Sequence, residues 1–185
     1  MAIRYLNPVA AVTNTNWDSS TVSELDQGET SNTWQTTANG ANLIVTLDDF
    51  DNTGVSCIDS IQLILVGNYD ARSGSWIANT DITDASGTSY YAENLTVPAG
   101  RTSSTLSGTV RTTSDGSAAW TDSNLDDLRI KVLSLNCTDK GQLNQFYINV
   151  TYSTGYGNAV NGVAAASIGK INGVATANIS KVNGI

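Results

Sequence analysis

Polar and apolar residues alternate along several short segments of this chain. In residues 128–135 (LRIKVLSL) and 145–152 (QFYINVTY), nearly every second side chain is apolar. A period of two places alternate side chains on one face of a β-strand, so that one face can pack on a core. Turn residues rich in Gly, Ser, Asn and Asp separate these segments from similar ones. Further strands are predicted over residues 41–47, 57–66, 75–82, 89–97 and 104–111.

Short strands at regular spacing, separated by turn signals, are typical of a β-sandwich. The sequence therefore predicts an all-β, antiparallel, jelly-roll-like β-sandwich. The strand at 57–66 has a continuous apolar second half, which indicates burial on both faces. Because a Gly-containing loop joins 41–47 to 57–66, these two strands are predicted to be adjacent and antiparallel. One short helical turn is predicted after Trp120, with Thr121 or Asp122 as its cap.

The chain divides into three parts on its pattern. Residues 1–40 are less regular, with Trp17 and Trp34 as isolated aromatic anchors, and predict an irregular N-terminal arm or an edge strand. Residues 41–155 form the predicted β-sandwich domain. Residues 156–185 form a C-terminal tail of eleven-residue repeats.

The tail repeats an Asn-Gly pair between β-branched residues. Such a pair is a strong hairpin signal, because both positions tolerate positive φ. An eleven-residue period also fits a right-handed helical supercoil, but a Gly in each repeat costs a helix about 1 kcal/mol. The pattern therefore favours β or extended structure, packed on its own body, a sister subunit or another protein. The repeated positions, a predicted assembly surface, are Val160, Asn161, Gly162, Val163, Ile168, Ile171, Asn172, Gly173, Val174, Ile179, Val182, Asn183, Gly184 and Ile185.

The charge balance limits the classes of partner. The formal net charge is -8, and the Lys and Arg residues are scattered along the chain. Nucleic acid is therefore not expected as a partner, because its phosphates would be repelled. No apolar stretch is long enough to span a membrane, and no secretory leader follows Met1. We expect synthesis in the host cytoplasm and no membrane partner.

The composition argues against catalysis. The chain has no His, which is the commonest general base, and no nucleophile motif, phosphate loop or dinucleotide fingerprint. Consecutive carboxylates such as Asp48 and Asp49 lie in predicted turns, where they are expected to be solvated. The sequence thus predicts a protein that is not an enzyme and has no cofactor.

Two minor alternatives concern metal ions and cysteines. Asp49, Asp51 and Asn52 offer oxygen ligands of the kind that Ca²⁺ prefers, but their spacing matches no EF-hand loop and a plain turn is favoured. Cys57 and Cys137 either form one disulfide or remain thiols at strand ends.

Aromatic residues supply a candidate glycan contact. Trp76, Tyr90 and Tyr91 can offer stacking platforms for a carbohydrate if their rings are exposed. Because Tyr90 and Tyr91 are adjacent in a predicted strand, one of them is expected to face outward. Core packing is the structural alternative for all three.

Several strings of residues carry a resemblance. Residues 58–152 contain IDSIQLILV, YYAENLTV, AWTDSNLDDLRIKV and FYINVTY. This segment resembles a β-sandwich domain of tailed-phage and prophage virion proteins. The tail units IGKINGVA and ISKVNGI look like the Lys-(Ile/Val)-Asn-Gly-Val repeats at the ends of phage structural and tail proteins.

The resemblance implies a non-enzymatic virion structural protein on the particle exterior. Within that class it implies a capsid decoration, or cement, protein that stabilises the particle through contacts with other virion proteins and with itself as a trimer. The alternative is a phage tail adhesin or a carbohydrate-binding module, which would bind a host glycan through exposed aromatic residues.

Overall fold

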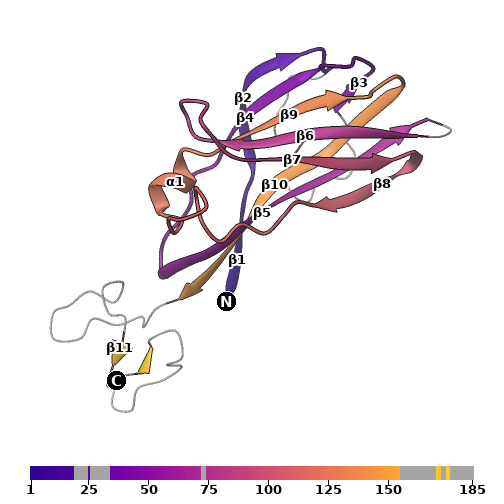
Figure 1. Cartoon of the computed structure of the whole chain (residues 1–185). Coiled ribbons are helices and arrows are strands. Elements are labelled where there is room, and N and C mark those ends of the chain that lie inside the picture. The colour runs from indigo at the N-terminus through magenta and orange to yellow at the C-terminus, as the bar shows by residue number, and fades with distance from the viewer. Residues whose placement is uncertain (19–24, 26–33, 72–73, 155–169, 172–173, 176–185) are drawn as a thin grey trace.

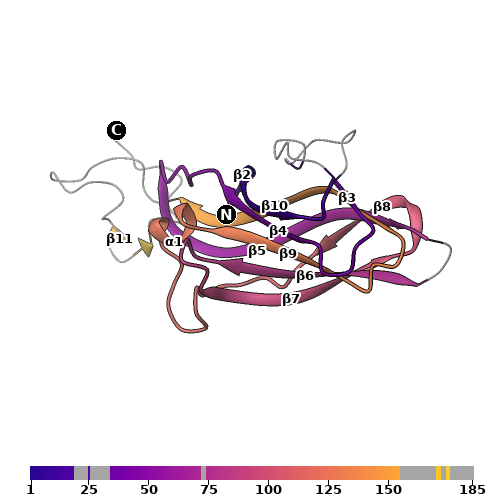
Figure 2. The ribbon, with the colours of Figure 1, turned by 90° about the horizontal axis from the view of Figure 1, so that it is seen from above.

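The computed structural model is an all-β, antiparallel sandwich, as the alternation predicts (Figure 1). It describes residues 1–18, 25, 34–71, 74–154, 170–171 and 174–175. Two five-stranded sheets face one another, and β7 and β10 lie on opposite sides of the sandwich when it is seen from above (Figure 2).

Sheet A contains β10 at its centre. Its strand order is β1-β10-β5-β8. β3 pairs with residues 141–143 of β10, whereas β1 pairs with residues 148–152 of the same strand. Sheet B has the order β2-β4-β9-β6-β7. The strands of sheet A are β1 (Ala2–Leu6), β3 (Trp34–Thr36), β5 (Val55–Asp70), β8 (Gly100–Ser107) and β10 (Lys140–Thr154). Those of sheet B are β2 (Pro8–Thr15), β4 (Asn42–Leu47), β6 (Ser75–Thr83), β7 (Ser89–Pro98) and β9 (Arg129–Leu135).

The core lies between the sheets and follows the predicted alternation. On β10, Phe146, Ile148 and Val150 are fully buried, and on β9 Ile130 and Val132 are fully buried. The second half of β5 is buried on both faces as expected, because Leu63, Ile64 and Leu65 are all buried in succession. Burial of such side chains is the main favourable contribution to folding.

Two predictions of strand placement are wrong. β4 and β5 are not neighbours, because β4 pairs with β2 and β9 in sheet B while β5 pairs with β10 and β8 in sheet A. The loop between them crosses from one sheet to the other. The strand predicted at 104–111 is β8, which ends at Ser107, although the Gly108 N–H still donates to the Leu63 carbonyl oxygen and Arg111 forms an isolated bridge with Ile61.

The first forty residues contribute three strands. β1 pairs with β10 and β2 pairs with β4, so that these strands lie at one edge of each sheet. Trp17 and Trp34 are buried in the core, as expected of anchors. Of the two alternatives for this region, regular edge strands are observed for β1 and β2 rather than an irregular arm.

The predicted helical turn is confirmed as α1 (Asp122–Asp126). Thr121 is its N-cap, and the Thr121 hydroxyl accepts a hydrogen bond from the Asn124 N–H. The Asn124 side chain in turn accepts from the Thr121 N–H, which completes a capping box. Leu125 is fully buried and fixes the turn to the core. No helix of the described segments has the length and apolar character needed to cross a membrane.

One tail repeat forms the predicted hairpin. β11 (Lys170–Ile171) and β12 (Val174–Ala175) are antiparallel, and Ile171 pairs with Val174. The other repeated positions of the predicted assembly surface lie outside the described residues.

Replacing Gly67 by Ala is expected to destabilise the fold. A Cβ at Gly67 would overlap the Gln142 carbonyl oxygen on β10, where only backbone movement can make room. We expect a loss of about 1–3 kcal/mol in the free energy of unfolding, measured by urea denaturation. Thr105→Ala on the exposed side of β8 is the control and should change it by less than about 0.5 kcal/mol. Equal stability of the Gly67→Ala variant and the parent would contradict the close approach of these strands.

Candidate functional site

The central part of the outward face of sheet A is uncharged and carries the most exposed aromatic pair among the described residues. Charged side chains of the same strands border it, with Asp59 at one end and Asp70, Arg101 and Lys140 at the other. Because Phe146, Ile148 and Val150 point into the core, the alternate residues of β10 and their neighbours in the sheet point outward. None of these side chains is charged, although the net charge of the protein is -8. This sheet A face consists of Ile3, Tyr5, Ser60, Gln62, Ile64, Val66, Thr105, Ser107, Gln145, Tyr147, Asn149 and Thr151.

Tyr5 and Tyr147 form an edge-to-face pair on this face. Their ring centroids are 5.6 Å apart and their planes meet at 87°. The Tyr5 side chain is 43% exposed, and Tyr147 is partly buried beside it. Burial raises the pKa of the Tyr147 hydroxyl, and Tyr5 raises it further. The Tyr147 hydroxyl therefore stays neutral and able to donate a hydrogen bond well above neutral pH.

A row of polar side chains continues from this pair across the sheet. Tyr5 lies opposite Asn149 on β10, and Asn149 lies opposite Gln62 on β5. Gln62 Nε2 donates to the Gly108 carbonyl oxygen over 2.9 Å, which orients its amide. The Asn149 Oδ1 atom is enclosed and has no hydrogen-bond partner among the described residues. The face thus presents an aromatic pair at one side and oriented amides beside it.

A groove of about 400 Å³ adjoins Tyr5 at the edge of the sheet. It lies between β1 and residues 48–51, and it brings the Asp48, Asp49 and Asp51 carboxylates close to Arg4. Burial raises the pKa of the Asp48 carboxyl, although the Asn7 N–H donates to this carboxylate over 2.6 Å. The groove is an acidic margin of the sheet A face.

Arg4 neutralises part of that margin. Its guanidinium lies 3.3 Å from Asp51 Oδ2 and donates to the Thr53 carbonyl oxygen over 3.2 Å. The guanidinium carbon also lies 5.1 Å from the Tyr152 ring centroid and 5.7 Å from that of Phe50. Arg4 is therefore held between two aromatic rings and one carboxylate, where a cation is well satisfied.

Two of the three candidate Ca²⁺ ligands, Asp51 and Asn52, are engaged within the protein. Asp51 pairs with Arg4 and accepts from the Thr53 N–H, and the Asn52 amide donates to Asp122 over 2.7 Å. The turn expected over Asp49, Asp51 and Asn52 is what the loop forms. Within the described ranges no group of three or more His, Cys, Asp or Glu is placed to hold a metal ion.

Trp76 cannot contact a glycan, so that the prediction for this residue is wrong. The side chain is fully buried, and its Nε1 donates to the Ser134 hydroxyl over 3.0 Å. Trp76 also lies edge-on to Trp17, with ring centroids 6.0 Å apart. An aromatic residue on the core-facing side of a strand is a packing anchor.

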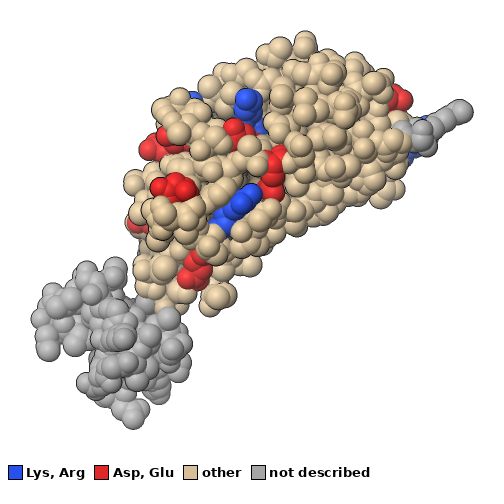
Figure 3. All heavy atoms as spheres, viewed as in Figure 1, with Lys and Arg blue, Asp and Glu red and all other residues tan. Residues whose placement is uncertain are grey.

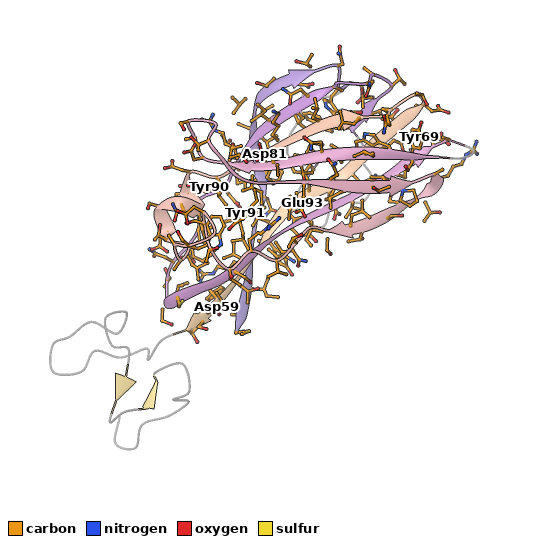
Figure 4. All side chains as sticks on the ribbon, in the orientation of Figure 1. Asp59, Tyr69, Asp81, Tyr90, Tyr91 and Glu93 are labelled. Atoms are coloured by element: carbon orange, nitrogen blue, oxygen red, sulfur yellow. The ribbon has the colours of Figure 1, made fainter. Side chains whose placement is uncertain are left out.

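Tyr90 and Tyr91 pack together at the α1 end of the sandwich (Figure 4). Tyr91 pairs with Ile82 and Ser89 pairs with Thr83, so Tyr90 is the extra residue of a β-bulge. The bulge turns both rings towards Trp120, at centroid distances of 5.5 and 6.3 Å, and alternation therefore does not expose one of them.

The hydroxyls of these two tyrosines are also engaged. Tyr91 donates to the Thr113 carbonyl oxygen over 2.5 Å, and the Arg111 guanidinium carbon lies 4.2 Å from the Tyr91 ring centroid. The Tyr90 hydroxyl accepts from the Asn124 amide over 3.3 Å. These contacts tie β7 to the loop before α1, and both rings are partly buried against the core.

The three carboxylates labelled in Figure 4 accept hydrogen bonds from neighbouring segments. Glu93 accepts from both the N–H and the hydroxyl of Thr109 over 2.9 Å. Asp59 accepts from the Ser153 hydroxyl, and Asp81 accepts from that of Ser89. The three carboxylates therefore have structural partners on different strands.

Cys57 and Cys137 are both free thiols, so no disulfide joins them. Cys57 lies near the start of β5, whereas Thr138, which follows Cys137, contacts the Tyr69 hydroxyl near the end of β5. Twelve residues of extended strand separate Cys57 from Tyr69, which is about 40 Å. The tertiary structure therefore places the two thiols at opposite ends of the sandwich.

Tyr5 and Tyr147 are the aromatic residues that the sequence analysis did not select. The available signal was the alternation itself, because a strand that buries Phe146 and Ile148 must direct Tyr147 outward. Tyr5 had no such signal until the pairing of β1 with β10 brought it beside Tyr147.

Comparisons with known proteins identify no family. No protein-family model and no curated protein matches the chain significantly. Among solved structures, the C-terminal family 6 carbohydrate-binding module of a laminarinase from Zobellia galactanivorans has 14% identity and a TM-score of 0.48, covering 81% of this chain and 99% of that one. A family 35 module from Cellvibrio japonicus has 13% identity and a TM-score of 0.45, covering 81% and 93%. At this similarity, the likenesses carry no inference about what the chain binds.

Thiol labelling should distinguish the two cysteines. Burial raises the pKa of the Cys57 thiol, and the Asp59 carboxylate raises it further. Iodoacetamide should therefore modify exposed Cys57 with a pH midpoint above that of a cysteine peptide, and Asp59→Asn should lower this midpoint. Cys137 should react only after unfolding. Mass spectrometry that found both thiols, or neither, modified in the native protein would contradict this assignment.

Proposed function

We propose that this protein is a non-catalytic carbohydrate-binding module and that the sheet A face is its binding surface. The observation that carries the proposal is the exposed Tyr5–Tyr147 pair beside an uncharged row of amides. This is the carbohydrate-binding alternative of the sequence analysis, assigned to other aromatic residues.

The chemistry of the face suits a sugar. A sugar ring has apolar C–H faces, which pack on aromatic rings, and its rim carries hydroxyls that both donate and accept hydrogen bonds. Tyr5 and Tyr147 supply the rings. Asn149 and Gln62 supply amide groups beside the rings, where the enclosed Asn149 Oδ1 leaves its amide to act as a donor. The two kinds of contact lie side by side, as a single sugar unit requires.

The rigidity of the face supports the proposal. Its side chains stand on paired strands of sheet A, and β10 pairs on both sides. The Tyr147 ring is already partly buried against Tyr5, so that little conformational entropy remains to be lost on binding. Sites built on strands keep their geometry better than sites built on loops.

A non-catalytic role is supported by the placement of the carboxylates. The residues of the sheet A face include none; Asp59 at its border accepts from the Ser153 hydroxyl, Asp81 accepts from Ser89, and Glu93 accepts from Thr109. With no His in the chain, the commonest proton-transfer group is also missing. Binding without chemistry is therefore the function that this surface supports best.

The virion role stays a prediction. Capsid decoration, trimer formation, location on the particle exterior and contacts with other virion proteins depend on the tail repeats, most of which lie outside the described residues. A host-glycan adhesin on a particle would use the sheet A face proposed here.

Removing either tyrosine ring should weaken glycan binding. Tyr5→Ala and Tyr147→Ala are each expected to lower affinity about tenfold, since an aromatic contact is worth about 1 kcal/mol or more. The double variant should lose detectable binding. Affinity electrophoresis in gels that contain soluble polysaccharides measures the effect.

Val12→Ala is the matched control, because Val12 is an exposed apolar residue on the edge of sheet B, away from the face. This variant should bind as the parent does. Thermal unfolding of each variant separates lost binding from lost folding. Parent-like binding by the folded double tyrosine variant would refute the proposed surface.

A further inference from the structure

We infer that the sheet A face takes an uncharged polysaccharide chain that lies across the strands, from β1 towards β8. This inference rests on the proposed function and names the class of glycan. It follows from two separate features of the face, its charge and the direction of its polar row.

The charge of the face opposes an anionic glycan. A site for uronates or sulfated sugars needs unengaged Lys or Arg side chains to pair with the anionic groups. The residues of the sheet A face include none, and of the cations that border it on β10 and β8, Lys140 lies opposite Asp70 and Arg101 pairs with Asp70. At its margin, Arg4 is paired with Asp51 beside Asp48 and Asp49, so that the excess charge there is negative.

Two arginines outside the sheet A face have partners. Arg101 on β8 lies 3.3 Å from the Asp70 carboxylate, and Arg111 lies over the Tyr91 ring. On the side that Figure 3 shows, Lys and Arg do not gather into a patch. With a net charge of -8, the protein would repel a polyanion.

The row of polar side chains gives the direction of the bound polysaccharide across the sheet. Tyr5, Asn149 and Gln62 are partners on three successive strands, and Gln62 reaches Gly108 next to β8. Tyr147, Ile64 and Ser107 form a second row beside the first. Each row spans three strands, so at ~4.8 Å spacing it is about 10 Å long, and the two rows together reach over four strands. Contacts spread over this length fit more than one sugar unit in line, whereas a monosaccharide would cover only one part of it.

Matched pairs of neutral and anionic polysaccharides test whether the sheet A face prefers an uncharged glycan. Affinity electrophoresis would compare hydroxyethylcellulose, dextran, galactomannan and starch with the carboxymethylated form of each backbone. We expect at least one neutral polymer to bind, and its carboxymethylated form to bind about tenfold more weakly or less at low salt. Raising the salt concentration should narrow this difference but leave neutral binding unchanged.

The outcomes separate the inference from the proposed function. A carboxymethylated polymer that binds as tightly as its neutral form, or more tightly, overturns the inference and leaves carbohydrate binding standing. Absence of binding to every polymer in both forms overturns the proposed function and the inference together.

Gln62→Ala tests the direction. If the chain crosses the strands, this variant should bind the neutral polymer about fivefold more weakly, with Tyr5 and Tyr147 intact. Thr96→Ala is the control, because Thr96 is exposed on β7 of sheet B, away from the sheet A face, and it should bind as the parent does. Parent-like binding by Gln62→Ala together with loss in Tyr5→Ala would show that the chain does not run across the sheet.

Discussion

The pairing of β5 with β10 is the interaction on which the rest of the structure depends. It joins residues from Val55 to Asp70 with residues from Thr154 back to Lys140, over the full length of both strands. β10 then carries β1 and β3 on its other side, and β5 carries β8. The pairing is long-range in sequence, so the chain must close large loops before sheet A exists. Nearly every position in sheet A is defined relative to these two strands.

The register of this pair links the core to the proposed binding surface. Ile148 lies opposite Leu63, and both are buried, while Tyr147 lies opposite Ile64 on the outward side. A slip of one residue would exchange the faces and direct the Tyr147 ring into the core. Burial of the apolar residues therefore also holds the aromatic pair and the amides in place. Bulges near Asn144 and near Thr151 adjust the strand without reversing this assignment.

The protein is acidic overall, yet the residues of the sheet A face are uncharged. Several carboxylates lie in turns, and others lie within strands, where Asp59, Asp81 and Glu93 accept hydrogen bonds from neighbouring segments. Hydrogen bonds from the neighbouring Ser86 and Thr88 lower the pKa of Asp84, and those from Ala118 and Ser117 lower that of Asp115. These carboxylates stay ionised and keep the protein acidic, while the residues of the sheet A face carry no charge.

The sequence predicted the strands after residue 40, their inward faces, the short capped helix and a hairpin in the tail, because each depends on residues that are near one another in the chain. It did not determine which strands are neighbours, and so it paired β4 with β5, left the two cysteines free to bond, and selected Trp76 and the bulged Tyr90–Tyr91 pair as ligand contacts. The pairing of β1 with β10 brought Tyr5 beside Tyr147, and partners on adjacent strands that are more than a hundred residues apart leave no local pattern in the sequence. Period and turn chemistry are local properties, whereas a binding surface is a property of strand order and register.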